Sequence, residues 1–383
     1  MEYKRLGDYI REVNVRNRDL KVTNLLGVSI SKEFMPSIAN TIGTDMSTYK
    51  IVERGQFAYG PVTSRNGDKV SIALLDGYDD AIISQAYTVF EVVDHERLLP
   101  EYLMMWFRRP EFDRYARFHS HGSAREIFDW DELCDVMLPV PSITRQREIV
   151  AEYETLTNRI CINEQMISKL EETAQTLYRK MFVEPVETSQ CGVSTLPDGW
   201  RMGTIGEFCL KMTSGGTPNR SNNIYWNSKD YPWLKSGEVH NNIINTIEEY
   251  ISKSGLDNSS AKIIPKGSVV MAMYGATAAQ VAYLNCDTTT NQACCNMICH
   301  SKEDAAFLFF HLLVNQNEIK KLANGGAQEN LSQELIAQQK IFILDNSDNK
   351  SVFVPILDNL IVLYKENEKL IELQSLLLAR MGQ

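Results

Sequence analysis

The chain has 383 residues, a net charge of −10 at neutral pH, and 44% hydrophobic and 23% charged residues. This composition is typical of a globular protein with room for two domains. No run of about 18 apolar residues is present and no apolar segment follows Lys4 and Arg5, so we expect neither a membrane span nor a secretory signal, and a cytoplasmic location. The negative charge weighs against an extended nucleic-acid-binding surface but leaves room for local basic clefts.

The eight cysteines are expected to be reduced thiols, because no export signal precedes them. Cys294, Cys295, Cys299 and His300 are the one group with some likeness to a zinc site. The group lacks a C-x-x-C pair and a second pair at the spacing of a zinc finger. We therefore predict small buried residues on a strand here, and no metal site.

The sequence repeats itself at an offset of about 200 residues, the scale of a domain duplication rather than of a solenoid. A single short match would carry no weight, but several matches in the same order indicate two similar halves. The matching segments are 6–10 with 205–209, 50–55 with 262–267, 59–60 with 274–275, 84–86 with 291–293, and 131–133 with 333–335.

Each half is predicted to begin with a mixed α/β domain. Residues 86–93 and 269–274 are rich in β-branched and aromatic residues, which is typical of strands. Residues 100–118 and 305–322 predict one helix in each half, the first starting at Pro100. The predicted boundaries are 1–143 for the first domain, 144–183 for the helix after it, 184–198 for a linker, 199–346 for the second domain and 347–383 for its helix.

Each half is predicted to end in a long amphipathic helix. Within 144–183 and 347–383, apolar residues alternate at spacings of four and three, as in the seam of a coiled coil. Each seam includes one asparagine, Asn163 or Asn367. The alternative is that each helix packs only on its own domain. Further seam positions are Ile160, Ile167, Leu170, Leu360, Leu363 and Leu370.

No motif of a catalytic site is recognisable. The sequence lacks the phosphate loop G-x-x-x-x-G-K-[ST], the dinucleotide loop G-x-G-x-x-G, the metal motif H-E-x-x-H and the nucleophile elbow G-x-S-x-G. It also lacks the Asn-Pro-Pro-aromatic tetrapeptide with which amino-methyltransferases hold a flipped adenine. We therefore expect no catalytic residues, with an enzyme that lacks a known motif as the alternative.

Polar, glycine-rich loops are the positive signal in the second half. In residues 213–220, glycines allow backbone N–H groups to approach an anion or a base edge. Asn and Gln side chains can bond adenine, and Arg can bond guanine. Ordinary surface turns are the alternative interpretation. The candidate DNA-binding residues of this half are Ser214, Gly215, Gly216, Thr217, Asn219, Arg220, Tyr274, Thr277, Thr290, Asn291, Gln292, Gln328 and Asn330.

The first half has comparable loops at 61–67 and 119–125, the second of which follows an arginine-rich helix. Arg108, Arg109, Arg114 and Arg117, with Arg97 and Arg125, form the densest cationic region and suggest phosphate contacts. Interspersed carboxylates favour the alternative of a solvated charged face. The candidates in this half are Thr63, Ser64, Arg65, Gln85, Arg114, Arg117, His119, His121, Ser123 and Arg125.

Seven sequence blocks of the second half occur together in a known family. They are 196–200, 214–218, 231–238, 250–256, 260–268, 274–277 and 291–292, including the strings LPDGW, SGGTP and YPWLKSGE. In this order they resemble the second target-recognition domain of the specificity subunits of type I restriction–modification systems. The first half is similar more loosely, through 50–55, 84–87 and 139–141 leading into Gln146, and the two terminal helices resemble the family's spacer regions.

The resemblance implies an α+β fold in which two pseudo-repeated α/β target-recognition domains are joined by two long antiparallel coiled-coil helices. Each domain would read one half of a bipartite, asymmetric site in double-stranded DNA, and the helices would set the spacing. The implied partners are two methyltransferase subunits, which bind S-adenosylmethionine where this chain binds no cofactor, and nuclease–translocase subunits. The alternatives are a free-standing sequence-specific DNA-binding protein and a coiled-coil scaffold that does not bind DNA.

Antiparallel helices allow the register to be predicted. An unpaired amide in an apolar seam is penalised, so Asn163 is expected to face Asn367. Leu156 facing Gln374 would be the one mixed layer. The other predicted pairs are Ile160 with Leu370, Ile167 with Leu363, and Leu170 with Leu360.

Overall fold

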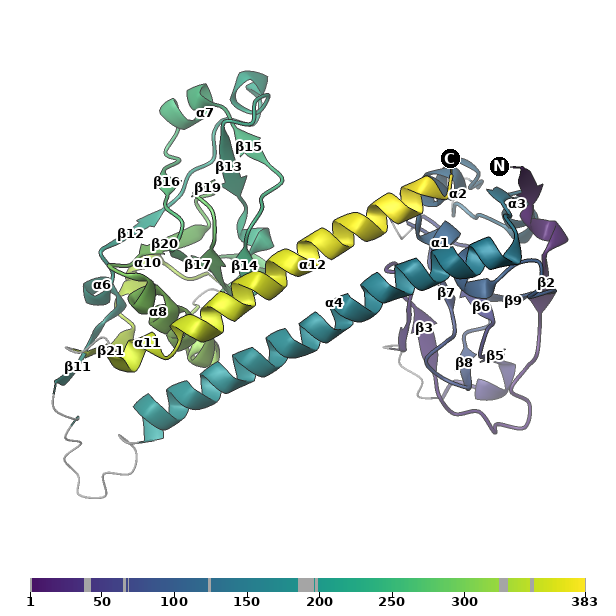
Figure 1. The fold of residues 1–383 in the computed structure, drawn as a ribbon, viewed down its shortest axis with the longest axis horizontal. Coiled ribbons are helices and arrows are strands. Elements are labelled where there is room, and N and C mark those ends of the chain that lie inside the picture. Colours follow the sequence, from purple (N-terminus) through teal and green to yellow (C-terminus); the bar gives the residue numbers. More distant parts are fainter. Residues whose placement is uncertain are drawn as a thin grey trace. The chain divides into compact units, whose positions relative to one another are not determined.

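The computed structural model describes residues 2–37, 43–64, 67, 69–122, 125–184, 196, 199–323, 330–344 and 348–382. The chain divides into two compact units, Met1–Ile160 with Lys369–Gln383, and Cys161–Glu368 (Figure 1). Each unit therefore contains a piece of both long helices. Most of the expected linker at 184–198 lies outside the described residues. No helix in the described ranges is long and apolar enough to cross a membrane.

The first unit is built around a four-stranded antiparallel sheet in the order β2–β9–β6–β7. These strands are Ile10–Val13, Thr88–Val92, Phe57–Tyr59 and Ile72–Leu74. Two-stranded sheets accompany it: β1 (Tyr3–Arg5) with β10 (Met137–Pro139), β3 (Leu26–Val28) with β4 (Phe34–Pro36), and β5 (Lys50–Glu53) with β8 (Asp80–Ile83). Its shorter helices are η1 (Leu6–Asp8), η2 (Met46–Thr48), α1 (Pro100–Arg108), α2 (Pro110–Phe118) and α3 (Trp130–Cys134).

The second unit contains a mixed five-stranded sheet in the order β12–β20–β17–β18–β14 and a four-stranded sheet in the order β15–β13–β19–β16. Their strands, in chain order, are β12 (Lys211–Ser214), β13 (Tyr231–Leu234), β14 (Asn242–Ile244), β15 (Tyr250–Ile251), β16 (Ile263–Ile264), β17 (Val269–Ala272), β18 (Val281–Leu284), β19 (Thr288–Thr290) and β20 (Cys294–Ile298). Strand β11 (Trp200–Thr204) pairs with β21 (Lys340–Leu344). The short helices are α6 (Ile205–Phe208), η4 (Asn223–Tyr225), η5 (Ser236–Glu238), α7 (Lys253–Asp257), η6 (Gly275–Thr277), α8 (Lys302–Val314), α9 (Gln316–Lys321), α10 (Gln333–Ala337) and α11 (Asp348–Ser351).

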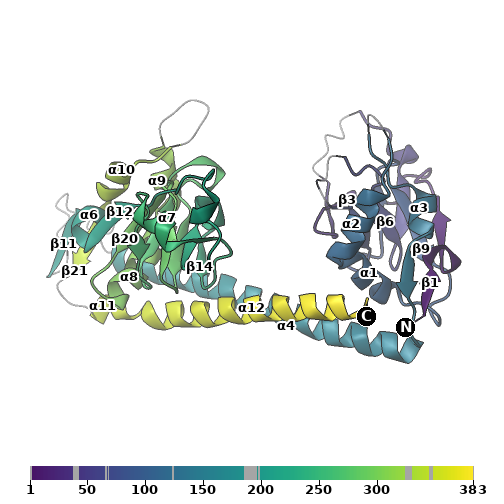
Figure 2. The same ribbon diagram turned by 90° about the horizontal axis from the view of Figure 1, so that it is seen from above.

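The two units repeat one topology, which confirms the predicted pseudo-repeat. The sheet order β2–β9–β6–β7 of the first unit recurs as β12–β20–β17–β18 in the second. The small pairs recur as well, because β5–β8 corresponds to β16–β19 and β1–β10 to β11–β21. Helix α8 packs on β17 and β18 in the second unit as α1 packs on β7 in the first. Figure 2 shows α8 and α1, each between the strands of its own unit and the long helices.

Each single helix predicted at 100–118 and 305–322 is instead a pair of helices. Pro110 starts α2 and leaves Arg109 in an extended conformation, with φ −70° and ψ 136°. Proline has no N–H to donate and disfavours a helical conformation in the residue before it, so α1 ends there. In the second unit, the non-helical residue Asn315 separates α8 from α9.

The two long helices, α4 (Ile143–Tyr178) and α12 (Val354–Arg380), run antiparallel within each unit. In the second unit the Asn163 amide donates to Asn367 Oδ1 at 2.8 Å, which confirms the predicted pair. The ring centre of Tyr178, at the end of α4, lies 6.3 Å from that of Phe353, which directly precedes α12. The end of α4 therefore lies beside the start of α12, as antiparallel helices require. Helix α4 continues as one π-helical turn, η3 (Arg179–Val183).

In the first unit the seam changes towards the end of α12. Gln374, expected in a mixed layer, donates its amide to Thr157 Oγ1 at 2.8 Å, so its polar group has a partner. Leu378 and Met381 pack against the core that contains Ile149 and Tyr153. Leu378 is not one of the predicted seam positions. The four–three spacing therefore does not identify every contact at this end of α12, where the helix packs on the first domain as well as on α4.

A buried histidine connects α4 to the core of the second unit. The Tyr178 hydroxyl lies 2.5 Å from His311 Nδ1, on α8. Burial lowers the pKa of His311 from 6.5 to about 4. Its ring is therefore neutral at pH 7, with Nδ1 free to accept from Tyr178.

This shift predicts a loss of stability in mild acid. Between pH 6.5 and about 4, His311 takes up a proton in the unfolded chain but not in the folded one, so protonation favours unfolding. We expect up to about 1.4 kcal/mol of lost unfolding free energy per pH unit from this one group. Urea unfolding at pH 7, 6 and 5 should show a shallower pH dependence in His311→Gln than in the wild type. Equal slopes would contradict the assignment.

Candidate nucleic-acid interface

Loops that are distant in the sequence meet at one edge of the second unit. The Gly216 amide donates to the Thr290 carbonyl at 2.8 Å, and the Thr217 hydroxyl donates to Gln292 Oε1. Ser236, at the start of η5, connects two more loops: its carbonyl accepts from the Thr277 hydroxyl at 3.1 Å, and its hydroxyl accepts from Asn291 at 3.4 Å. The predicted loop residues at 214–217, 277 and 290–292 therefore form one continuous edge, which we call the second-unit edge.

Several candidates form the frame of this edge rather than its surface. Gly215 and Gly216 are buried, and a Cβ on Gly215 would lie 2.1 Å from the Thr290 carbonyl oxygen. Thr290 is fully buried, and its hydroxyl accepts from Asn296 at 2.9 Å. Glycine is needed at both positions because other backbone segments of the domain lie too close to leave room for a side chain. Ser214, Thr217, Thr277 and Asn291 are half-buried, whereas Asn219, Arg220, Tyr274, Gln292 and Asn330 are exposed.

Arg220 is held by its own domain. Its guanidinium lies 3.7 Å from the ring centre of Trp226 and 4.6 Å from that of Trp233, and it forms an ion pair with Glu249. Hydrogen bonds from Arg220 and from Lys235, together with their positive charges, hold the pKa of Glu249 below its ordinary value. Arg220 therefore fixes the loop, and a contact with guanine would require it to exchange Glu249 for the base.

Sequence reasoning missed the exposed residues that follow Arg220. Ile224, in η4, is 62% exposed, and Asn223, Asn227 and Lys229 are exposed beside it. The run of asparagines from 219 to 227 was the available signal. Gln328 lies outside the described residues; Asn330 forms a bridge with Tyr274.

The first unit brings its candidates together around residues 119–127. Thr63 is buried and donates to Ser120 Oγ at 3.0 Å, so it joins two loops. His119 and His121 lie 3.0 and 3.5 Å from the carboxylate of Glu132. Ser64, Gln85 and Arg125 are exposed, and Arg65 and Ser123 are outside the described residues.

The arginines of the first unit do not share one surface. Arg109 is buried over the ring of Trp106 at 4.1 Å. Arg114 and Arg117 are the exposed pair on α2, where they contact Glu111 at 3.1 Å and Glu126, respectively. The cationic surface of this helix is thus narrower than the sequence suggested.

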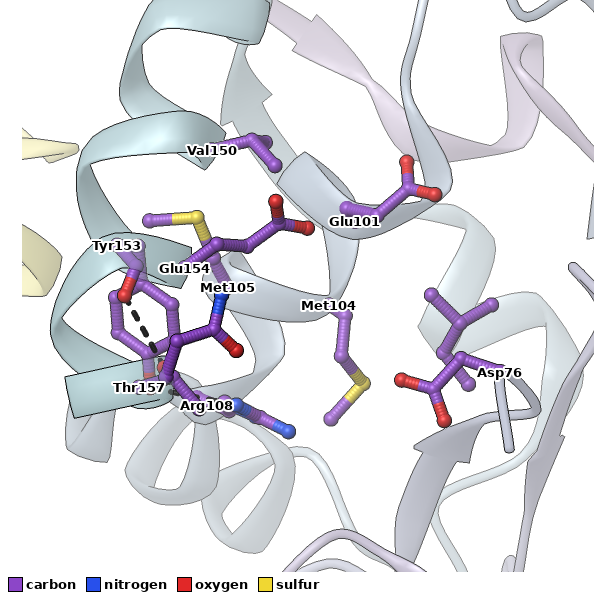
Figure 3. Close-up of a pocket in the computed structure, with 11 residues that line it drawn as sticks. Asp76, Glu101, Met104, Met105, Arg108, Val150, Tyr153, Glu154 and Thr157 are labelled. Carbon is purple, nitrogen blue, oxygen red and sulfur yellow. Dashed lines mark hydrogen bonds between the residues drawn. The ribbon is translucent and has the colours of Figure 1, made fainter. Parts of the chain in front are cut away.

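Arg108 points into a cavity of about 410 Å³ between α1 and α4 (Figure 3). It donates to the Tyr153 hydroxyl at 3.3 Å. The same cavity is lined by the carboxylates of Asp76, Glu101 and Glu154. With three carboxylates and one arginine, the lining of this cavity has a net negative charge and repels phosphate. The exposed arginines of α2 are the better candidates for phosphate contacts in this unit.

The cysteine group of the second unit is built into its sheet. Cys294 and Cys295 are fully buried in β20, and burial raises the pKa of both thiols to about 12. Such thiols do not form thiolate ligands readily. Among the residues that the structure describes, no group of three or more His, Cys, Asp or Glu side chains is placed to hold a metal ion.

Comparison with known proteins agrees with this architecture. Residues 197–374 match the family model of the type I restriction modification DNA specificity domain. The chain is 23% identical to the specificity subunit of the type I restriction enzyme HindI from Haemophilus influenzae, over 98% of this chain and 97% of that protein. It is 24% identical to the EcoR124I/EcoR124II specificity subunit from Escherichia coli, over 40% of this chain and 39% of that protein.

A solved structure shows the same fold. The S subunit of a type I restriction–modification system from M. genitalium is similar with a TM-score of 0.57 and 11% identity, over 100% of this chain and 96% of that one. The family match, the relative that spans nearly the full length and the duplicated fold lead to one conclusion. Residues 197–374 carry the type I restriction modification DNA specificity domain, and over nearly its whole length the chain is similar to the specificity subunits of type I restriction–modification systems.

Proposed function

We propose that this chain reads a bipartite, asymmetric site in double-stranded DNA on behalf of a type I restriction–modification complex, without catalysing a reaction itself. The observation that carries the proposal is the duplicated topology, in which each copy of the sheet β2–β9–β6–β7 has its own set of polar loops. Two similar but non-identical readers suit two different half-sites. The antiparallel pair α4 and α12 sets the spacing between them.

The proposal assigns a different kind of DNA contact to the named residues of each unit. On the second-unit edge, the exposed amides of Asn219 and Gln292 read base edges in the major groove. On the first unit, Arg114 and Arg117 hold phosphates, which positions the domain without specifying sequence. The buried residues Gly215, Gly216 and Thr290 act by fixing the shape of the edge.

The long helices also provide two apolar grooves, one in each unit. In the second unit Ile162, Met166, Leu170, Val362 and Leu363 line a groove of about 590 Å³. Ile162, Met166 and Val362 are 49%, 46% and 62% exposed, so apolar side chains of both helices face solvent here. We name this the α4 groove, after the helix that supplies most of its lining.

The groove of the first unit has a volume of about 390 Å³ and is lined by Leu156, Leu373, Leu376 and Leu377. We name it the α12 groove. Exposed apolar strips of this kind mark protein-binding surfaces. Two such grooves suit two copies of one partner, and we propose that each receives one methyltransferase subunit. Those subunits supply S-adenosylmethionine and flip the adenine; nuclease–translocase subunits join this core.

Mapping methylated adenines in cells that express this chain with its methyltransferase tests the proposal. We expect methylation at one bipartite sequence. Exchange of residues 1–143 for the corresponding domain of a related subunit should change one half-site and leave the other intact, because each domain reads separately. A hybrid that assembles with the methyltransferase yet alters both half-sites would refute separate reading.

The same experiment separates the alternatives. A free-standing DNA-binding protein would bind its duplex without the methyltransferase and direct no methylation. A coiled-coil scaffold would bind no specific duplex in the presence of excess competitor DNA.

A further inference from the structure

We infer that Phe118 is an apolar wedge that enters the base stack of the DNA bound by the first unit. Phe118 is the last residue of α2 and is 81% exposed, more than any other large hydrophobic side chain in the described ranges. The inference rests on the proposed function and adds a residue that deforms the DNA to those that hold or read it.

Phe118 stands at the end of a groove along one face of α2. Pro110, Asp113, Arg114, Arg117 and Phe118 recur at spacings of three, one, three and one, which places them on the same side of a helix. They line a groove of about 510 Å³. Lys69, three residues before the start of β7, lines the same groove from another segment of the chain. The ring is thus flanked by three cationic side chains.

Asp113 is the one carboxylate among the residues that line this groove, and its charge is balanced by Lys32 inside the domain. Asp113 Oδ1 lies 2.8 Å from Lys32 Nζ and accepts from the Val70 amide at 3.0 Å. Both charged side chains of this pair are buried, so Asp113 is used inside the domain. The charge that the groove presents to a ligand is therefore that of Lys69, Arg114 and Arg117.

The two arginines can exchange their present partners for phosphate. Arg114 and Glu111 form a surface pair three residues apart, with side chains 68% and 50% exposed. Arg117 and Glu126 are 40% and 38% exposed. Surface pairs of this kind contribute about 1 kcal/mol or less, so a polyanion competes with them readily.

The setting of the ring favours DNA over a protein partner. Protein-binding hot spots lie in the centre of apolar patches with a polar rim. Here a single ring projects from a cationic rim, next to His119, whose own ring stacks on Tyr115 at 4.2 Å. Proteins that bend DNA insert such rings between base steps while neighbouring cations hold the backbone.

The test uses the chain assembled with its methyltransferase and a duplex that carries the mapped target. We expect Phe118→Ala to weaken specific binding by about 5-fold to 100-fold, the effect of losing one base–aromatic stack. The slope of log K against log salt should stay unchanged, because no phosphate contact is lost. Phe118→Trp should retain most of the affinity. Arg114→Gln should instead reduce the slope by about one phosphate contact.

The fluorescence of 2-aminopurine reports the wedge directly. Placed at successive steps of the first half-site, away from the methylated adenine, it should brighten at one step with the wild type and at none with Phe118→Ala. Val93→Ala, which alters a 57% exposed side chain elsewhere on the unit, is the matched control and should behave as the wild type.

Three outcomes would overturn the wedge. They are unchanged affinity and fluorescence in Phe118→Ala, a reduced salt slope in that variant, or loss of the methyltransferase from it, which would assign the ring to a protein contact. If the wild-type complex itself shows no preference for the mapped duplex, the proposed function fails and not the wedge alone.

Discussion

Leu373→Glu with Leu376→Glu is expected to release one methyltransferase subunit from the assembled complex and leave the other in place. The two side chains are 48% and 53% exposed in the α12 groove, so the substitution places two charges where a partner would bury apolar surface. Losing two buried leucines alone corresponds to at least a 100-fold weaker association, about 3 kcal/mol. Native mass spectrometry should show one methyltransferase per chain in place of two.

The matching substitution in the α4 groove is Ile162→Glu with Met166→Glu, and it should release the other copy. Ile371→Glu is the control, because Ile371 is 53% exposed on α12 but outside the groove lining. If either double variant loses both copies at once, or if both keep two, the grooves are not separate docking surfaces.

Asn367→Leu is expected to destabilise the second unit by about 1–3 kcal/mol, and Asn163→Leu by clearly less. Asn163 is fully buried, and in the described structure its side chain makes one hydrogen bond, which it donates to Asn367, while its own Oδ1 has no partner. Removing Asn367 therefore leaves both polar atoms of a buried amide unpaired. Removing Asn163 leaves the half-buried Asn367, which can turn to water.

The double variant with leucine at both positions should recover the lost stability but not the register. An apolar seam without its polar pair tolerates slippage by a layer. Urea unfolding measures the first effect. Disulfide trapping between cysteines at 170 and 360, compared with 170 and 356, measures the second. Equal destabilisation by the two single substitutions would contradict the asymmetry between the amides.

The sequence predicted the features that depend on local periodicity and on repetition. The heptad spacing identified α4 and α12, and the pair Asn163–Asn367 followed from one physical requirement, that a buried amide needs a partner. The order of the repeated segments indicated two similar domains before any strand pairing was known. The division of residues 100–118 was also readable, since Pro110 is a recognised helix start, but the continuous apolar pattern outweighed it.

The surface of the candidate site was less predictable, because burial in loops is decided by distant segments. Gly216 and Thr290 are bonded across the fold, and no local pattern distinguishes them from Gln292, which is exposed. Composition likewise gave no sign that Arg220 is sandwiched against Trp226 while Phe118 projects into solvent. Both outcomes depend on which elements the topology brings together.

Because each unit contains part of both long helices, neither half of the gene encodes a complete unit. Residues 369–383 complete the first unit, and residues 161–178 belong to the second. When two related genes recombine between their two halves, the product combines α4 from one parent with α12 from the other. Recombination between two such genes therefore yields a folded product only where the seam residues of the two parental helices match, which limits the lineages that can exchange recognition domains.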